Sequence, residues 1–196
     1  MKKWLCPLPF VHTAMRPGGL YGTCCESKKS SISIHDQSPI EFFNSEYSQK
    51  LRGAFLTDHP EKELIIQEVC GICLDSEKNF GTSKRTRELE EKGEEGWDDQ
   101  ILEKNYNIVK KDPTQHLEPS MKFFKIAVGN TCNLKCIMCN PYSSSLIGGY
   151  VYDPDFSDDF YEDLNKILPS CQVLQFAGGE PTILKNSCLK VLQWCI

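Results

Sequence analysis

The feature that most restricts the fold is a loop with three cysteines that directly follows an apolar run. Residues 123–128 are almost continuously apolar, and residues 129–140 then read GNTCNLKCIMCN. This loop places Cys132, Cys136 and Cys139 in a C-x3-C-x2-C array. Three thiolates in one loop are a ligand set for iron–sulfur chemistry, and three rather than four leave one iron of a four-iron cluster open.

The residues on either side of this loop predict a strand and a helix. The apolar run before the loop fits a parallel strand that is buried on both faces. Apolar residues then recur at helical spacing between residues 156 and 168. Asp158 and Asp159 favour the N-terminus of this helix, and Pro169 ends it.

A second strand and a further helix are predicted after Pro169. Residues 172–177 are the second apolar strand, so residues 122–177 predict one crossover between two parallel strands. An amphipathic helix is predicted from residue 184 to residue 196, with Leu189, Val191, Leu192 and Trp194 as its apolar residues. Three further cysteines are predicted to be small core residues: Cys171, Cys188 and Cys195.

Gly178, Gly179 and Glu180 directly follow the second strand. Two glycines let a ligand approach the backbone closely, and Glu180 supplies a hydrogen-bond acceptor. On these residues alone, a tight strand-to-helix turn is an equally good interpretation. The parallel topology predicts that this turn and the cysteine loop open on the same carboxyl edge of the sheet.

These motifs resemble those of the radical SAM superfamily. The three cysteines of the loop match the family's cluster-binding triplet, and Met138 stands where the family carries a hydrophobic or aromatic residue. The resemblance implies a [4Fe-4S] cluster whose open iron binds S-adenosylmethionine. The Gly178-Gly179-Glu180 turn resembles the family's GGE motif, which implies that its backbone and Glu180 hold the amino group of that cofactor.

An N-terminal β-hairpin is predicted around the turn signal Pro17-Gly18-Gly19, with strands at residues 8–15 and 20–23. The hairpin carries cysteines at both ends and brings Cys6 near the Cys24-Cys25 pair. Because neighbouring residues of a strand point to opposite faces, only one member of the pair is expected to be a ligand. Cys24 is preferred, with Cys25 as its replacement.

Two helices are predicted after the hairpin and a polar loop at residues 26–37. Residues 38–41 carry a possible Ser cap, a Pro at the first helical position and a Glu three residues on. The second helix has an apolar stripe of Tyr47, Leu51 and Phe55. Arg52, beside that stripe, is interpreted as a solvated charge.

A helical pattern over residues 61–69 ends on Cys70-Gly71-Ile72-Cys73, a spacing that presents two thiolates to one metal. With Cys6 and Cys24 this pair completes a four-thiolate site, which is closed and therefore structural or electron-carrying. Spacing alone leaves zinc and iron–sulfur equal. This segment resembles auxiliary-cluster modules of the twitch or SPASM type, which implies a second iron–sulfur cluster. The resemblance is carried by the hairpin ending in two cysteines, the later Leu-Arg helix, the C-x2-C and Ser83-Lys84-Arg85.

The expected fold class is α/β, with three parts. Residues 1–84 form a small α+β cysteine-rich module, residues 85–118 a charged helix and linker, and residues 119–196 the first two strand–helix units of a partial TIM barrel. The resemblance implies about six such units in the family's whole domain, so the chain is interpreted as a fragment of a longer protein. Residues 85–95 are interpreted as a solvated helix face that residues 96–99 break.

Composition excludes several classes of protein. The net charge of -5 provides no overall field that would attract nucleic acid or an anionic membrane. No apolar run approaches the roughly 20 residues of a membrane span, and the N-terminus lacks the apolar core of a signal peptide. An odd total of eleven cysteines makes a secreted disulfide framework the weaker interpretation. The four histidines show no ligand spacing, and we expect a cytoplasmic protein.

The leading hypothesis is a radical SAM enzyme that cleaves S-adenosylmethionine reductively to a 5'-deoxyadenosyl radical, which abstracts a substrate hydrogen. Such an enzyme requires a reducing electron donor, and the N-terminal site would relay electrons or bind substrate. Relatives with auxiliary clusters often modify peptides, so a peptide or protein is the first expected substrate. The alternative hypothesis is a non-enzymatic zinc or iron–sulfur protein that binds metal or transfers electrons.

Overall fold

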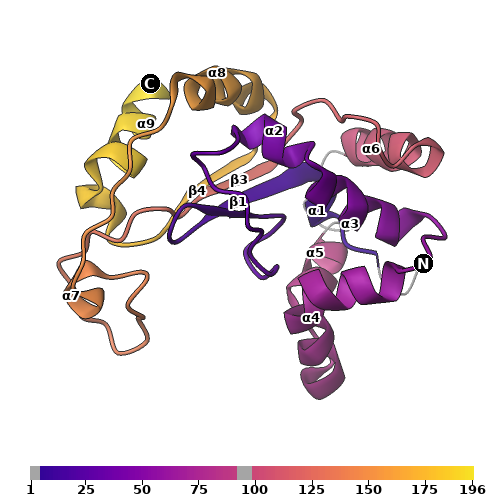
Figure 1. The fold of residues 1–196 in the computed structure, drawn as a ribbon, viewed down its shortest axis with the longest axis horizontal. Helices are drawn as coiled ribbons and strands as arrows, with labels where there is room; N and C mark the ends of the chain where they lie inside the picture. Colours follow the sequence, from indigo (N-terminus) through magenta and orange to yellow (C-terminus); the bar gives the residue numbers. More distant parts are fainter. Residues whose placement is uncertain (1–4, 92–98) are drawn as a thin grey trace.

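The computed structural model describes residues 5–91 and 99–196, and its centre is a four-stranded sheet of order β2-β1-β3-β4 (Figure 1). The strands are β1 (His12–Arg16), β2 (Leu20–Gly22), β3 (Phe123–Ile126) and β4 (Val173–Phe176). β1 pairs with β2 in antiparallel orientation and with β3 in parallel, and β3 pairs in parallel with β4. The N-terminal hairpin and the C-terminal crossover therefore share one sheet across the expected boundary near residue 118.

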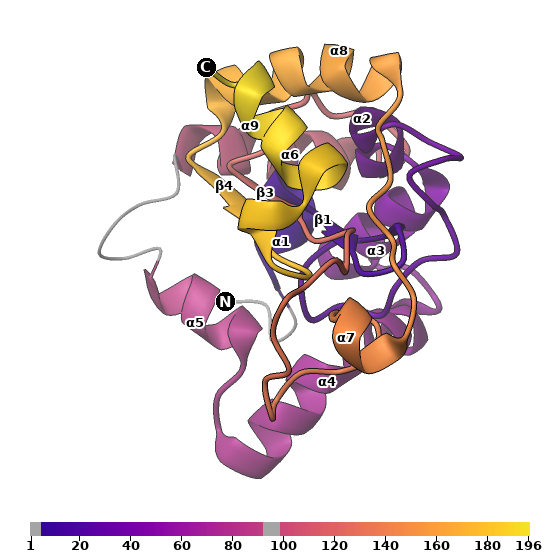
Figure 2. The same ribbon diagram turned by 90° about the vertical axis from the view of Figure 1, so that its left-hand side faces the viewer.

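Helices surround this sheet and form two arms on one side of the molecule. Helices α4 (Lys62–Phe80) and α5 (Lys84–Glu91) form one arm, and the loop with α7 (Ser145–Gly148) forms the other (Figures 1 and 2). The remaining helices are α1 (Leu8–Val11), α2 (Pro39–Phe43), α3 (Glu46–Leu56), α6 (Asp99–Lys111), α8 (Asp158–Ile167) and α9 (Lys190–Trp194). None of the described helices is long and apolar enough to cross a membrane.

The N-terminal strand prediction is wrong in its first half. Residues 8–11 form the helical turn α1, because Pro7 and Pro9 fix the backbone near helical φ values. The chain becomes extended only at His12. The predicted hairpin turn is confirmed, and Gly18 and Gly19 adopt positive φ values of 86° and 76° that favour glycine.

The two following helices begin as predicted, but the side chain of Arg52 is buried where exposure was predicted. Ser38 and Glu41 form a reciprocal capping box at α2, and the apolar stripe of α3 packs into the core. Arg52 is fully buried, which corrects its interpretation as a solvated charge. Its guanidinium donates to the Phe43 carbonyl at 2.5 Å and lies 4.8 Å from the Phe43 ring centroid. Helix α3 is packed against α1, α2, α4 and α6, so no face near Arg52 is left to solvent.

The sequence predicted that Cys70 and Cys73 lie at the end of a helix. They lie instead within helix α4. The helix continues for seven residues past Cys73 and ends at Gly81, which has a φ of 73°. A single Gly71 is tolerated because its cost in a helix is only about 1 kcal/mol. Cys70 and Cys73 therefore lie one turn apart on the same helix face.

The charged run after α4 is only partly solvated. Helix α5 buries Arg85 and Glu88, in contrast to the predicted solvated face, and Glu88 pairs with Lys84. The predicted break at residues 96–99 falls almost wholly outside the described residues. Helix α6 then packs on α1 and α3 through buried residues that include Leu102 and Val109.

The C-terminal crossover forms as predicted. Ser157 caps α8, a short helical turn at residues 168–170 contains Pro169, and β4 returns parallel to β3. The burial of β3 alternates, with Phe124 and Ile126 buried, whereas burial on both faces had been predicted.

The last predicted helix is interrupted. It begins with a 3-10 turn at Pro181–Ile183 and a π turn at Lys185–Leu189, and only then becomes α9. Of its predicted apolar residues, Val191 is buried, but Leu192 and Trp194 are exposed. Cys188 is a core residue as expected, whereas Cys171 is half-buried and Cys195 is exposed.

Two candidate metal centres

The cysteine loop and the Gly-Gly-Glu turn meet at the carboxyl edge of the parallel strands. The loop follows β3 and the turn follows β4. The Gly179 amide donates to the Gly129 carbonyl at 2.9 Å, and the Glu180 amide donates to the Thr131 carbonyl at 2.8 Å. The two predicted motifs are thus joined directly, backbone to backbone, at one edge of the sheet.

This contact requires both glycines. Gly178 has a φ of 104°, and a Cβ there would lie 2.4 Å from the Gly129 carbonyl oxygen. A Cβ at Gly179 would lie 2.1 Å from the Thr131 carbonyl oxygen. Both distances are far shorter than a van der Waals contact, so only glycine allows the two loops to approach this closely.

Hydrogen bonds fix the first residues of the cysteine loop. The Cys132 amide donates to Ser145 Oγ at 3.1 Å, and the Ser145 amide donates to the Asn130 carbonyl at 2.7 Å. The buried Asn130 side chain accepts from the Tyr152 amide at 2.7 Å and donates to the Tyr150 carbonyl at 3.3 Å. Sequence reasoning missed Asn130 and Ser145, although an amide side chain at a strand end is a frequent turn signal.

The upper part of the loop is exposed. Cys136 is exposed, and Cys132 and Cys139 are partly exposed. Met138 is 89% exposed and packs against little of the described structure. The thiols are therefore accessible for a ligand to reach from outside.

The Glu180 carboxylate lies at the same edge. It accepts from the Thr182 amide at 3.2 Å and from Thr182 Oγ1 at 2.8 Å, and so caps the turn at Pro181–Ile183. These two hydrogen bonds, the hydroxyl first, lower the pKa of the Glu180 carboxyl. An ionised carboxylate is the form that can accept from a ligand amino group.

The second site is a small cavity lined by four cysteines from three distant segments. Cys6 precedes α1, Cys24 follows β2, and Cys70 and Cys73 come from α4. All four are the residues that sequence reasoning grouped together, and Cys24 rather than Cys25 lines the cavity. Their role as metal ligands stays a prediction.

Burial controls the protonation of these thiols. It raises the pKa of Cys6 well above its ordinary value, and neighbouring Cys24 and Cys70 raise it further. Burial also raises the pKa of Cys24 to about 12 and increases that of Cys70. The thiols of Cys6, Cys24 and Cys70 are therefore neutral when no cation is bound, and a bound metal would release their protons.

One hydrogen-bond donor contacts this thiol group, and a second lies in the lining of the cavity. The Ser27 amide donates to Cys24 Sγ at 3.2 Å. The Thr23 hydroxyl also lines the cavity, is buried, and has no partner among the described residues. An unpaired buried hydroxyl is uncommon, and it is explained if an acceptor such as a cluster sulfur occupies the cavity.

The four thiols suit a four-iron cluster as ligands, but the cavity between them is too small to hold one without a change in the side chains. The cavity holds about 10 Å³, room for about one water molecule, so a cluster would have to push the side chains apart. A larger cavity of about 230 Å³ opens beside it and shares Glu26, Cys73 and Lys84. Of the four cysteines, Cys73 is the one that also lines this neighbouring cavity.

No three His, Cys, Asp or Glu side chains in residues 5–91 and 99–196 are close enough to bind a single metal ion. In a tetrahedral zinc site the sulfurs lie roughly 3.8 Å apart, given zinc–sulfur bonds of about 2.3 Å. A four-iron cluster spaces its ligands more widely because each thiolate binds a different iron. The identity of the metal therefore stays a prediction at both sites.

Arg85 fastens the segment that carries Cys6. Its guanidinium forms an ion pair with Glu77 of α4 and donates to the Leu5 carbonyl at 3.1 Å. Ser83 Oγ donates to the same Glu77 at 2.6 Å. Sequence reasoning placed Arg85 in a solvated run and missed this contact, although Ser83-Lys84-Arg85 belonged to the resemblance.

Comparison with known proteins gives one informative match. The chain is 43% identical over 60 residues to 7,8-dihydro-6-hydroxymethylpterin dimethyltransferase of Methanocaldococcus jannaschii. The matched segment covers 30% of this chain and 12% of that protein, so the chain spans only a small part of its relative. No known family profile matches the chain, and no solved structure matches it. The chain thus shares a segment with an enzyme.

Proposed function

We propose that this chain provides the first part of a radical SAM enzyme. The observation that carries the proposal is the direct contact between the cysteine loop and the Gly-Gly-Glu turn, made by the Gly179–Gly129 and Glu180–Thr131 hydrogen bonds. A three-thiolate loop and a cofactor-amine acceptor must lie side by side if the open iron of the cluster and Glu180 are to bind the same molecule of S-adenosylmethionine. The segment shared with a dimethyltransferase supports an enzymatic function.

In this proposal the residues of the sheet edge have distinct tasks. Cys132, Cys136 and Cys139 hold the cluster, and Met138 covers it. Glu180, which now accepts from Thr182, would accept from the amino group of S-adenosylmethionine, and the two glycines keep its turn against the cysteine loop. When bound, the cluster and S-adenosylmethionine supply reductive cleavage to a 5'-deoxyadenosyl radical and abstraction of a substrate hydrogen.

The N-terminal site has a different task. Cys6, Cys24, Cys70 and Cys73 would close the coordination of a second [4Fe-4S] cluster, which leaves no open iron. Such a site suits electron relay from a reducing donor or a structural role. We further propose a cytoplasmic location and a peptide or protein substrate. The odd number of eleven cysteines supports a reducing compartment over a disulfide framework.

Anaerobic reconstitution with iron and sulfide tests the proposal. We expect two cubane clusters in the native chain and one in Cys136→Ala, measured by iron content and by electron paramagnetic resonance. Cys195→Ala is the matched control, because Cys195 is exposed and lies in neither site, and it should retain both clusters. Zinc without iron in the native chain, or loss of both clusters in Cys136→Ala, would overturn the proposal.

A second candidate function, metal binding or electron transfer without catalysis, is favoured by the closed four-thiol cavity. The same reconstituted chain separates the two. S-adenosylmethionine should perturb the cluster that Cys136→Ala removes, because only that cluster has an open iron. If S-adenosylmethionine perturbs neither spectrum, the non-enzymatic function is supported.

A further inference from the structure

Two cations without a carboxylate partner lie at the same sheet edge as the cysteine loop. Arg16 ends β1, and Lys29 lies in the loop after β2. Neighbouring Lys28 forms an ion pair with Glu68 at 2.8 Å. Neither Arg16 nor Lys29 forms an ion pair with any carboxylate that the structure describes. In a chain with a net charge of -5, such an uncompensated pair calls for an explanation.

Arg16 is held so that one edge of its guanidinium stays open. Nη1 donates to the carbonyl of Cys25, to that of Cys24 at 3.3 Å and to that of Ser27 at 3.2 Å. Nε and Nη2 form no hydrogen bond with the described residues. The Nε–Nη2 edge is a planar pair of donors that matches the two oxygens of a carboxylate or a phosphate.

Lys29 lies close to this guanidinium and to the cysteine loop. Its Nζ donates to the Pro17 carbonyl at 2.9 Å and lies 5.6 Å from the ring centroid of Tyr142, which follows the cysteine loop. Partial burial and the charge of Arg16 both lower the pKa of Lys29. Two like charges that approach each other without a counter-ion form a site that an anion would stabilise.

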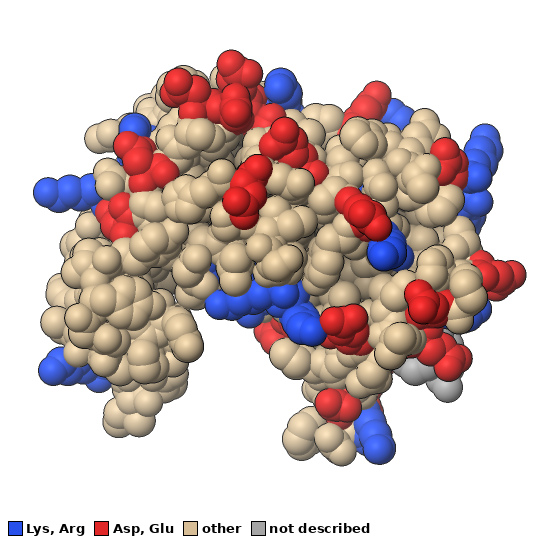
Figure 3. All heavy atoms as spheres, in the orientation of Figure 1, with Lys and Arg blue, Asp and Glu red and all other residues tan. Residues whose placement is uncertain are grey.

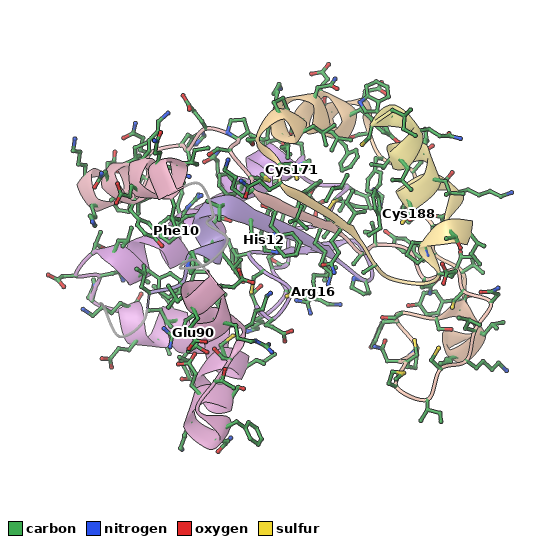
Figure 4. All side chains as sticks on the ribbon, turned by 180° about the vertical axis from the view of Figure 1, so that it is seen from behind. Phe10, His12, Arg16, Glu90, Cys171 and Cys188 are labelled. Carbon is green, nitrogen blue, oxygen red and sulfur yellow. The ribbon has the colours of Figure 1, made fainter. Side chains whose placement is uncertain are left out.

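The pictures show a hollow at this edge of the sheet. Figure 3 shows a hollow between the two arms, with Lys and Arg atoms at its roof. In Figure 4, Arg16 lies at the end of the sheet, between the arm of α4 and α5 and the arm of the cysteine loop. The strand order puts the cysteine loop after β3 between the Glu180 turn after β4 and Arg16 on β1. A cofactor held by Glu180 would therefore occupy one side of the loop and leave the Arg16 side for substrate.

We propose that Arg16 and Lys29 bind an anionic group of the substrate, a carboxylate or a phosphate, on the β1 side of the cysteine loop. The Nε–Nη2 edge of Arg16 would take two oxygens of that group, and Lys29 Nζ would add a third donor. The assignment to substrate rests on the proposed function. The anion site itself requires neither cluster nor S-adenosylmethionine.

Isothermal titration calorimetry on the full chain without metal tests the site, with inorganic phosphate and succinate as separate probes. The native chain should bind at least one of them. Arg16→Gln and Lys29→Gln should each bind it roughly tenfold more weakly, as expected for the loss of a charge-assisted hydrogen bond. Lys28→Gln is the matched control, since it removes the same charge from a neighbouring exposed residue, and its affinity should be unchanged.

The outcomes separate the ligand classes and the two proposals. Tighter binding of phosphate indicates a phosphorylated substrate, and tighter binding of succinate indicates a carboxylate. No binding of either probe, or equal weakening in Lys28→Gln, would overturn the site. Because Arg16 also holds the Cys24 turn, Lys29→Gln alone decides the test if Arg16→Gln fails to fold. Cluster formation without anion binding removes this inference only, whereas anion binding without clusters removes the proposed function.

Discussion

The two cysteine sites differ in how they are built. The C-terminal triplet lies within eight consecutive residues on an exposed loop, and its base is fixed by Asn130 and Ser145. The N-terminal group is assembled from three segments that are far apart in the chain, and its thiols are mostly buried. The first site therefore depends on one local contact with the neighbouring turn, and the second depends on tertiary packing. Changes in the fold should affect them separately.

The largest expected effect is on the N-terminal site. Arg85→Ala removes the ion pair with Glu77 and the hydrogen bond to the Leu5 carbonyl, and it leaves Glu77 partly buried without its cationic partner. We expect a loss of about 3 kcal/mol in the free energy of unfolding, measured by urea denaturation. Iron at the four-cysteine site should fall while iron at the triplet remains.

Lys104→Ala is the control for this change, because its ion pair with Glu118 is exposed and should contribute less than about 1 kcal/mol. Equal loss of iron from both sites in Arg85→Ala would show that the two sites are not independent.

Acid should also weaken the N-terminal part. Burial lowers the pKa of His12 to about 4, and its Nε2 has no partner among the described residues. The unfolded chain, with a His pKa near 6.5, then binds more protons than the folded chain between about pH 4 and 6.5. Stability should therefore fall by about 2 to 3 kcal/mol as the pH drops through this window.

Urea titrations at several pH values measure this dependence, and His12→Phe should flatten it because phenylalanine does not titrate. A native curve that is already flat between pH 4 and 6.5 would contradict the burial of a neutral His12.

The next effect concerns the triplet. Gly179→Ala places a Cβ against the Thr131 carbonyl, so the turn must separate from the cysteine loop. We expect a loss of roughly 2 kcal/mol in stability. Iron bound by the triplet should decrease, and iron at the four-cysteine site should not change.

Gly71→Ala is the matched control in the other site. Gly71 lies inside α4 between the two cysteines, and its nearest neighbour is the flexible end of Gln67 at 3.3 Å. Alanine should raise stability by up to about 1 kcal/mol there and leave both sites loaded. Loss of iron from the four-cysteine site in Gly71→Ala would show that Cys70 and Cys73 do not lie in a regular helix.

The smallest effect concerns the unpaired Thr23 hydroxyl. Thr23→Val removes that group at nearly constant volume, so the chain without metal should become more stable by roughly 1 kcal/mol. With a cluster bound, the same change should lower the reduction potential of that cluster, because a hydrogen bond to sulfur is lost. An unchanged potential would show that Thr23 does not face a cluster.

The sequence predicted the features that depend on near neighbours. The capping box at Ser38, the stripe on α3 and the crossover from β3 to β4 follow from spacing over a few residues. The cysteine groups were also recognised, since closely spaced thiols are a frequent pattern of metal ligands. Prolines at positions 7 and 9 could have corrected the predicted first strand, because they favour a helical turn.

The features that the sequence did not predict depend on distant partners. Arg52, Arg85 and Glu88 have the side chains of solvated helix residues, and only the packing of neighbouring segments buries them. The pairing of β1 with β3 joins residues about a hundred positions apart, and no local pattern records it.

By itself, the sequence determined which thiols are available and which short elements carry them. Only the tertiary structure decided that the N-terminal hairpin and the C-terminal crossover share one sheet, with Arg16 at the end of β1. The physical reason is that propensity and periodicity act within a few residues. Strand pairing and burial instead depend on which remote surfaces fit together.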